Sequence, residues 1–155
     1  MRLFHDARQA GHAPVRELHN GDWMPYIETP ARLSAILGLC GPREPARDFG
    51  RAPLEAVHDP AYLAFLETAH ADWLAADRGG DAIGYSFPVV RRRRLAFGRI
   101  DARLGAFSMD AATPIAAGTW DAAYWSAQAA LTALAALAEG ERHAGALSGQ
   151  VPQKS

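Results

Sequence analysis

Helical and strand-like segments alternate along this chain, and the alternation excludes most fold classes. The strand-like segments are MRLFH (1–5), PLEAVH (53–58) and ERHAGAL (141–147). Helical patterns fill residues 30–40, 59–76 and 119–139. Strands that alternate with helices are typical of an α/β fold with a parallel sheet. We therefore expect one parallel sheet with helices packed against it.

Capping residues predict where the three helices begin. Thr29 and Asp59 each precede a proline, and both residue types accept hydrogen bonds from the free N–H groups of a first helical turn. The third helix is expected to open at Thr119, directly after Gly118, and to stop at Gly140. Its spacing predicts a buried stripe. That stripe consists of Tyr124, Ala127, Leu131, Leu134 and Ala138.

A connection rich in Gly and Arg, residues 79–118, separates the second and third helices. Within it, RIDARLGAF (99–107) has the pattern of a short helix, and Arg91–Arg94 form a run of four positive charges. Such a run can bind phosphates, but no aromatic platform or second basic cluster accompanies it. A solvated loop is the preferred interpretation of the run.

Overall charge and cysteine content narrow the function classes. Sixteen Lys and Arg face 17 Asp and Glu, so the chain has none of the basic excess of a nucleic-acid binder. No apolar window has the length of a membrane span, and no signal peptide is recognisable. The single Cys40 forms no internal disulfide. We expect a soluble, cytoplasmic protein without nucleic-acid or membrane partners.

Histidines are the natural candidates for metal binding. His5, His12 and His19 recur every seven residues, but glycines and a proline interrupt any helix that would align them, so they are interpreted as loop residues. His58 and Asp59 are adjacent, yet neighbouring side chains point in different directions, and capping already accounts for Asp59. We predict no metal site in this chain.

Three segments carry a resemblance to a known family: HDPAYLAFLETA (58–69), SFPVVRR (86–92) and TPIAAGTW (113–120). Together they resemble the N-terminal part of bacterial acetylpolyamine amidohydrolases, of the histone deacetylase family, and the resemblance covers residues 1–143. Glu28, Pro30 and Arg32 look like an early element of that family. The resemblance implies part of an arginase-like, three-layer α/β fold.

The resemblance also implies an activity for full-length relatives. They hydrolyse acetyl-amine bonds of an acetylated polyamine or acetyl-lysine-like substrate with a catalytic zinc and a histidine base. Their zinc ligands follow an R-P-P-G element beyond the third helix, where the likeness of this chain ends at about Ala144. His143 precedes that point and is no substitute. We therefore expect a deacetylase-like segment (1–143) with a divergent polar tail (144–155), which lacks zinc, catalytic residues and activity of its own.

Asp101 is the single substrate-binding candidate. It falls where the polyamine enzymes carry an acidic residue at the rim of the site, and a carboxylate there would attract a distal ammonium group. The alternative is an ordinary surface pair with Arg99 or Arg103. At the level of the whole chain, the alternative function is a non-catalytic binding or dimerisation module that uses the 79–118 loop.

Three tryptophans complete the candidates. Trp73, Trp120 and Trp125 are predicted to lie in the core or on a docking surface. If further sheet strands normally covered them, the chain would display an apolar patch of the kind that marks association.

Overall fold

A computed structural model describes residues 1–87 and 98–147. The chain divides into two compact units. Among the described residues, the first unit contains 1–13, 28–58 and 118–147, and the second contains 14–27, 59–87 and 98–117. Each unit is described by itself.

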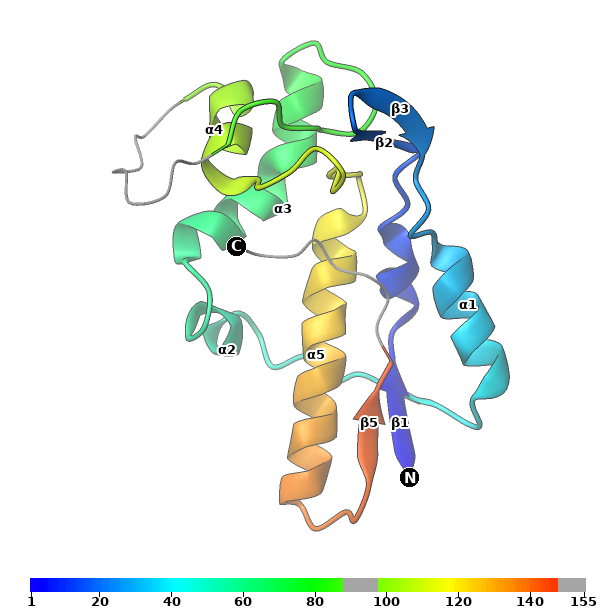
Figure 1. The fold of residues 1–155 in the computed structure, drawn as a ribbon. Helices are drawn as coiled ribbons and strands as arrows, with labels where there is room; N and C mark the ends of the chain where they lie inside the picture. Colours follow the sequence, from blue (N-terminus) through cyan, green and yellow to red (C-terminus); the bar gives the residue numbers. More distant parts are fainter. Residues whose placement is uncertain (88–97, 148–155) are drawn as a thin grey trace. The chain divides into compact units, whose positions relative to one another are not determined.

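The first unit is built on a parallel sheet (Figure 1). Its elements are β1 (Arg2–His5), the 3₁₀ helix η1 (Ala7–Gly11), α1 (Pro30–Leu39), β4 (Glu44–Pro45), α2 (Ala52–Glu55), α5 (Thr119–Ala138) and β5 (Ala144–Ala146). The strand order is β4-β1-β5, and β1 is parallel to both neighbours. The α/β class and the parallel sheet are confirmed.

One face of this sheet packs on α5. Phe4 of β1 is 2% exposed and meets Ala133 and Ala136 of α5, with Ala144 and Ala146 of β5 against the same cluster. Figure 1 shows α5 running along β5 and β1. Small alanines on the helix let its backbone approach the sheet closely, so Phe4 fills the space between them.

The buried side of α5 differs from the predicted stripe. None of its five residues is buried: Leu134 is 63% exposed and Ala138 is exposed, while Tyr124, Ala127 and Leu131 are half-buried. The prediction of this stripe is therefore wrong. The buried face instead carries several polar residues. They are Thr119, Ser126, Gln128 and Thr132, which lie among Ala122, Trp125, Ala129, Ala133 and Ala136. Polar side chains can occupy this face because the chain around α5 supplies hydrogen-bond partners.

The second unit contains a hairpin and two helices. The hairpin strands β2 (Arg16–His19) and β3 (Asp22–Pro25) are antiparallel, and α3 (Pro60–Ala75) contacts α4 (Ile100–Phe107). Asp59 caps α3, because its carboxylate accepts a 2.8 Å hydrogen bond from the N–H of Ala61. The helices predicted at 59–76 and 99–107 are confirmed.

Several sequence expectations about strands need correction. Residues 53–58 contain the end of helix α2 and a turn rather than a strand, because Pro53 lies in the first turn of a helix, which it stabilises. The hairpin and β4 were not predicted from the sequence. The strand predicted at 141–147 is confirmed as β5, residues 144–146, which are also the first residues of the predicted divergent tail. Residues 148–155 lie outside the described part, so the rest of that tail stays a prediction.

Candidate functional site

Asp101, the predicted substrate residue, lies in the first turn of α4. Its side chain is 10% exposed, and Oδ2 accepts hydrogen bonds from Arg78 Nη2 at 2.9 Å and from Arg99 Nη2 at 3.1 Å. Oδ1 is buried without a hydrogen-bond partner among the described residues. Two guanidinium groups therefore compensate one carboxylate, and a cation that approached Asp101 would have to compete with both.

Arg103, the other arginine considered for Asp101, pairs elsewhere. Its Nη1 lies 2.5 Å from Oδ2 of Asp72 on α3, and Thr68 donates to the same oxygen at 2.8 Å. This pair ties α4 to α3 independently of Asp101. Asp101 thus has the Arg99 partner that the surface-pair alternative expected, and Arg78 in addition.

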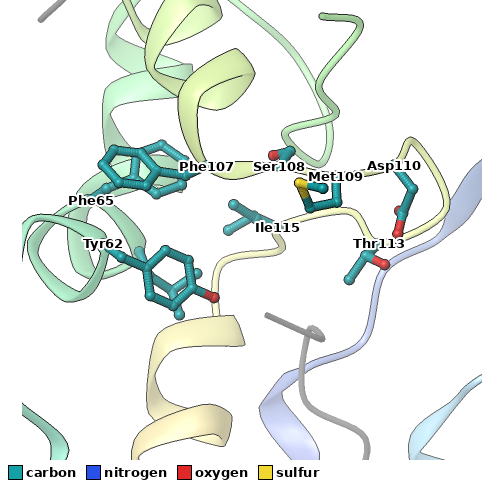
Figure 2. A pocket seen from close by; sticks show the side chains of 9 residues that line it. Tyr62, Phe65, Phe107, Ser108, Met109, Asp110, Thr113 and Ile115 are labelled. Carbon is teal, nitrogen blue, oxygen red and sulfur yellow. The ribbon is translucent and has the colours of Figure 1, made fainter. Parts of the chain in front are cut away.

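A small pocket lies between α3 and the segment that follows α4 (Figure 2). Its lining is aromatic on the helix side and mixed on the loop side. The lining residues are Tyr62, Phe65, Leu66, Phe107, Ser108, Met109, Asp110, Thr113 and Ile115. The rings of Phe65 and Phe107 stack with centroids 4.8 Å apart, and burial raises the pKa of Tyr62.

The pocket is too small for the predicted substrate class. Its volume is about 30 Å³, which accommodates one or two water molecules. The carboxylate of Asp110 faces its own turn, since Oδ1 accepts a 2.9 Å hydrogen bond from Ala112 N–H. The pocket was not predicted from the sequence, although Tyr62 and Phe65 lie on the helix that was predicted at 59–76.

A second hollow, of about 250 Å³, lies between β1, β4 and α5 in the first unit. Its charged lining residues pair with one another: Arg2 bonds Glu44 at 2.6 Å, and Arg47 bonds Glu139 at 3.2 Å. Both pairs are compensated, so this hollow offers no uncompensated charge to a ligand.

The three evenly spaced histidines occupy different environments. His5 ends β1, where burial and the nearby Arg43 lower its pKa. His12 lies in a loop, as predicted, but it is only 4% exposed, and its Nδ1 lies 2.8 Å from Thr119 Oγ1 at the start of α5. The loop interpretation is wrong for His5 and His19, which are the last residues of strands β1 and β2. His19 is exposed at the end of β2.

The described residues do not form a zinc site. Within residues 1–87 and 98–147, no three His, Cys, Asp or Glu side chains come close enough together to hold a metal ion. A catalytic zinc needs three such ligands and an open position. The His, Cys, Asp and Glu side chains of the described residues therefore do not provide the ligands for the zinc that the resemblance implies for full-length relatives.

The tryptophans belong to different surroundings. Trp125 is buried at 9% exposure, and the Arg8 guanidinium lies 3.4 Å from its ring centroid. Trp120 is partly buried, and its ring is tilted by 41° relative to that of Tyr124. The indole N–H of Trp73 donates to the Gly79 carbonyl. The core role predicted for Trp125 is confirmed.

Two predictions concern residues outside the described part. The arginine run 91–94 lies within residues 88–97, as does the centre of the 79–118 loop that was predicted to form a dimer contact. Both stay predictions. Among the described residues, no helix combines the length and apolar character needed to cross a bilayer.

Comparison with known proteins first defines the class of fold. A crystal structure of an acetylpolyamine aminohydrolase from Burkholderia pseudomallei superposes on 91% of this chain and 42% of its own, with a TM-score of 0.81 and 34% identity. The chain therefore has an arginase/deacetylase-like α/β fold. No family model matches the chain.

Sequence relatives then give the family. Acetylpolyamine amidohydrolase 2 of Pseudomonas aeruginosa is 40% identical over 137 residues, which are 84% of this chain and 40% of the relative. Acetylpolyamine amidohydrolase 1 of the same organism is 41% identical over 145 residues, 88% of this chain and 41% of the relative. The chain is a homologue of acetylpolyamine amidohydrolases, and it spans about two fifths of the length of the relatives it matches.

Proposed function

We propose that this chain forms the N-terminal part of a zinc-dependent deacetylase that hydrolyses acetyl-amine bonds of acetylated polyamines. The observation that carries the proposal is the homology, with about 40% identity to acetylpolyamine amidohydrolases over 84% of the chain but 40% of the relative. The substrate could also be an acetyl-lysine-like amine, because the chemistry of the bond is the same. A cytoplasmic location belongs to the same proposal.

The chain by itself is proposed to be inactive. Its described residues supply no group of three metal ligands, and a zinc hydrolase needs the metal to polarise the carbonyl and activate water. The missing ligands would come from the part of the domain that this chain does not span. Catalysis is therefore a property of the completed domain.

Asp101 is proposed to act at the substrate-binding rim of that completed domain. Its unpartnered Oδ1 supports the proposal, because that atom keeps its capacity to accept a hydrogen bond from an ammonium group. Arg78 and Arg99 oppose it, since they already compensate the carboxylate. Asp101 therefore acts on a cationic substrate only if Arg99, whose side chain is 82% exposed, moves away.

The proposal is tested by completing the domain. The gene for this chain is fused to the remaining three fifths of the Pseudomonas relative, and zinc content and release of acetate from a monoacetylated diamine are measured for the fusion and for the chain alone. We expect bound zinc and turnover for the fusion and neither for the chain alone. Zinc-dependent turnover by the chain alone, or a folded fusion that binds no zinc, would contradict the proposal.

Within the same fusion, Asp101→Asn separates the two roles of this residue. A substrate role raises KM for a monoacetylated diamine but leaves KM for an acetylated amine without a distal charge unchanged. A purely structural role lowers stability and affects both substrates alike. Asp72→Asn, which breaks the neighbouring pair with Arg103, is the control.

A further inference from the structure

Helix α5 has a second apolar face, opposite the one that packs on the sheet. Residues 122–138 contain no charged side chain; the polar residues lie on the buried face, and the opposite face carries only Ala and Leu. A helix without a charged face is normally covered on both sides. Here one side meets β1 and β5, while Leu134 is 63% and Leu137 42% exposed.

The exposed and half-buried residues of this face form a continuous stripe at helical spacing, which we call the outer stripe. It consists of Ala127, Ala130, Leu131, Leu134, Leu137 and Ala138. These positions follow the i, i+3, i+4, i+7 pattern of one helix face, and none is polar. Leu and Ala at this spacing form a shallow surface against which another helix can pack closely.

The helix that carries the outer stripe is followed by a strand at the edge of the sheet. The chain leaves α5 and turns directly into β5, which contacts α5 and pairs with β1 on one side. Among the described residues, β5 has no strand on its other side. Parallel sheets occur with both faces covered and rarely consist of strands as few and short as these. An element that continues the sheet past β5 would pair with this free edge, while the outer stripe needs cover from a second element on the far side of α5.

The lengths of the relatives indicate which polypeptide covers the outer stripe. They share this fold at 34–41% identity but are more than twice as long as the matched stretch, so most of their domain has no counterpart in this chain. A membrane surface fits poorly, because Glu139 and Glu141 follow the stripe where a membrane-binding helix would carry basic residues.

We propose that the outer stripe of α5 and the free edge of β5 are the docking surface for the part of an acetylpolyamine amidohydrolase domain that this chain does not contain. This inference rests on the proposed function, and it adds which surface of this chain makes the contact. Docking of that part supplies strands beyond β5 and an apolar layer over Leu134 and Leu137.

The test supplies the missing part as a separate polypeptide. This chain is co-expressed with a tagged C-terminal three fifths of Pseudomonas acetylpolyamine amidohydrolase 2, and the complex is isolated by the tag and sized by light scattering. We expect a one-to-one complex that the double variant Leu134→Glu/Leu137→Glu weakens by at least tenfold. Leu39→Glu is the matched control, because Leu39 is 92% exposed in the same unit but lies on α1.

Several outcomes would overturn the inference. They are a complex that both variants form equally well, no complex with a chain that circular dichroism shows to be folded, and a homodimer of this chain that uses the stripe and excludes the tagged partner. If the tagged C-terminal part does not accumulate as a separate polypeptide, this chain is fused covalently to it and the variants are compared in the fusion. In the fusion, the double variant should reduce monomeric yield and the Leu39→Glu variant should not.

The docking and the activity can fail separately. A stripe-dependent complex without zinc or turnover would uphold the surface and contradict the proposed function. An active complex that tolerates both glutamates in α5 would uphold the function and contradict the surface.

Discussion

At the residue scale, close backbone contact limits what some positions accept. Gly118 caps α5, and a Cβ built on it would lie 2.4 Å from the carbonyl oxygen of Gly11. Its φ of −94° is ordinary for any residue, so the requirement for glycine is steric and does not come from an unusual backbone conformation. The contact places η1 against the start of α5, where His12 meets Thr119.

Gly118→Ala should therefore destabilise the protein by about 1–3 kcal/mol, because the obstacle is backbone that cannot turn away as a side chain does. Gly38→Ala is the same substitution in the last turn of α1, where a Cβ meets no atom within 4 Å. It should stabilise by roughly 0.5–1 kcal/mol through helix propensity. Urea unfolding of both variants measures the two effects, and a Gly118→Ala variant as stable as the parent would contradict the steric argument.

At the scale of elements, three polar side chains one turn apart attach a loop to α5. Tyr124 donates to Asp48, Gln128 accepts from Phe49 N–H at 2.7 Å, and Thr132 accepts from Arg47 N–H at 2.9 Å. Gln128 also donates to the Gly50 carbonyl at 3.1 Å and is fully buried. A loop over an apolar helix needs such partners because its own backbone groups lack water.

Gln128→Leu should lower the free energy of unfolding by about 1–3 kcal/mol, because the N–H of Phe49 and the carbonyl of Gly50 lose their shared partner. Gln128→Glu retains an acceptor for Phe49 but loses the donor to Gly50, so it tests the two bonds separately. Urea unfolding and hydrogen exchange of the Phe49 amide measure the effects. Unchanged exchange of that amide in the leucine variant would show that the side chain does not hold the loop.

At the scale of the whole molecule, carboxylates paired with arginines connect stability to acid pH. Hydrogen bonds from Arg8 lower the pKa of Asp6, those from Arg2 lower the pKa of Glu44, and the Tyr124 hydroxyl lowers that of Asp48. A carboxyl group with a lowered pKa in the folded state holds fewer protons there than in the unfolded chain. Its contribution is therefore complete above the ordinary values of 3.8 for Asp and 4.5 for Glu.

The free energy of unfolding should consequently decrease as the pH falls below about 4.5 toward the lowered folded-state pKa values. The double variant Asp6→Asn/Glu44→Gln should be less stable than the parent at neutral pH and should show a flatter dependence between pH 5 and roughly pH 2. Urea unfolding across this range tests the expectation. Parallel curves for the variant and the parent would indicate that these pairs form with equal strength in both states.

Much of the fold could be predicted from short sequence patterns. The helix starts after Thr29, Asp59 and Gly118 were predicted because they depend on neighbours in sequence. The capping hydrogen bond itself forms at Asp59, whereas the Thr29 side chain makes none. The β2–β3 hairpin was missed although Asn20 and Gly21, both with positive φ, carry a strong turn signal. The short segment around Pro53 was assigned to a strand because few residues cannot distinguish the two periods.

The sequence alone determined the three long helices, the parallel α/β class and the homology to acetylpolyamine amidohydrolases, because periodicity, caps and short motifs are local. Tertiary structure alone decided which side of α5 is buried, since the buried side carries Ser126, Gln128 and Thr132 and is selected by contacts with Phe4 and the 47–50 loop, which are distant in sequence. It also decided the partners of Asp101, because the contact with Arg78 joins residues far apart in the chain, whereas a sequence pattern reports only on near neighbours.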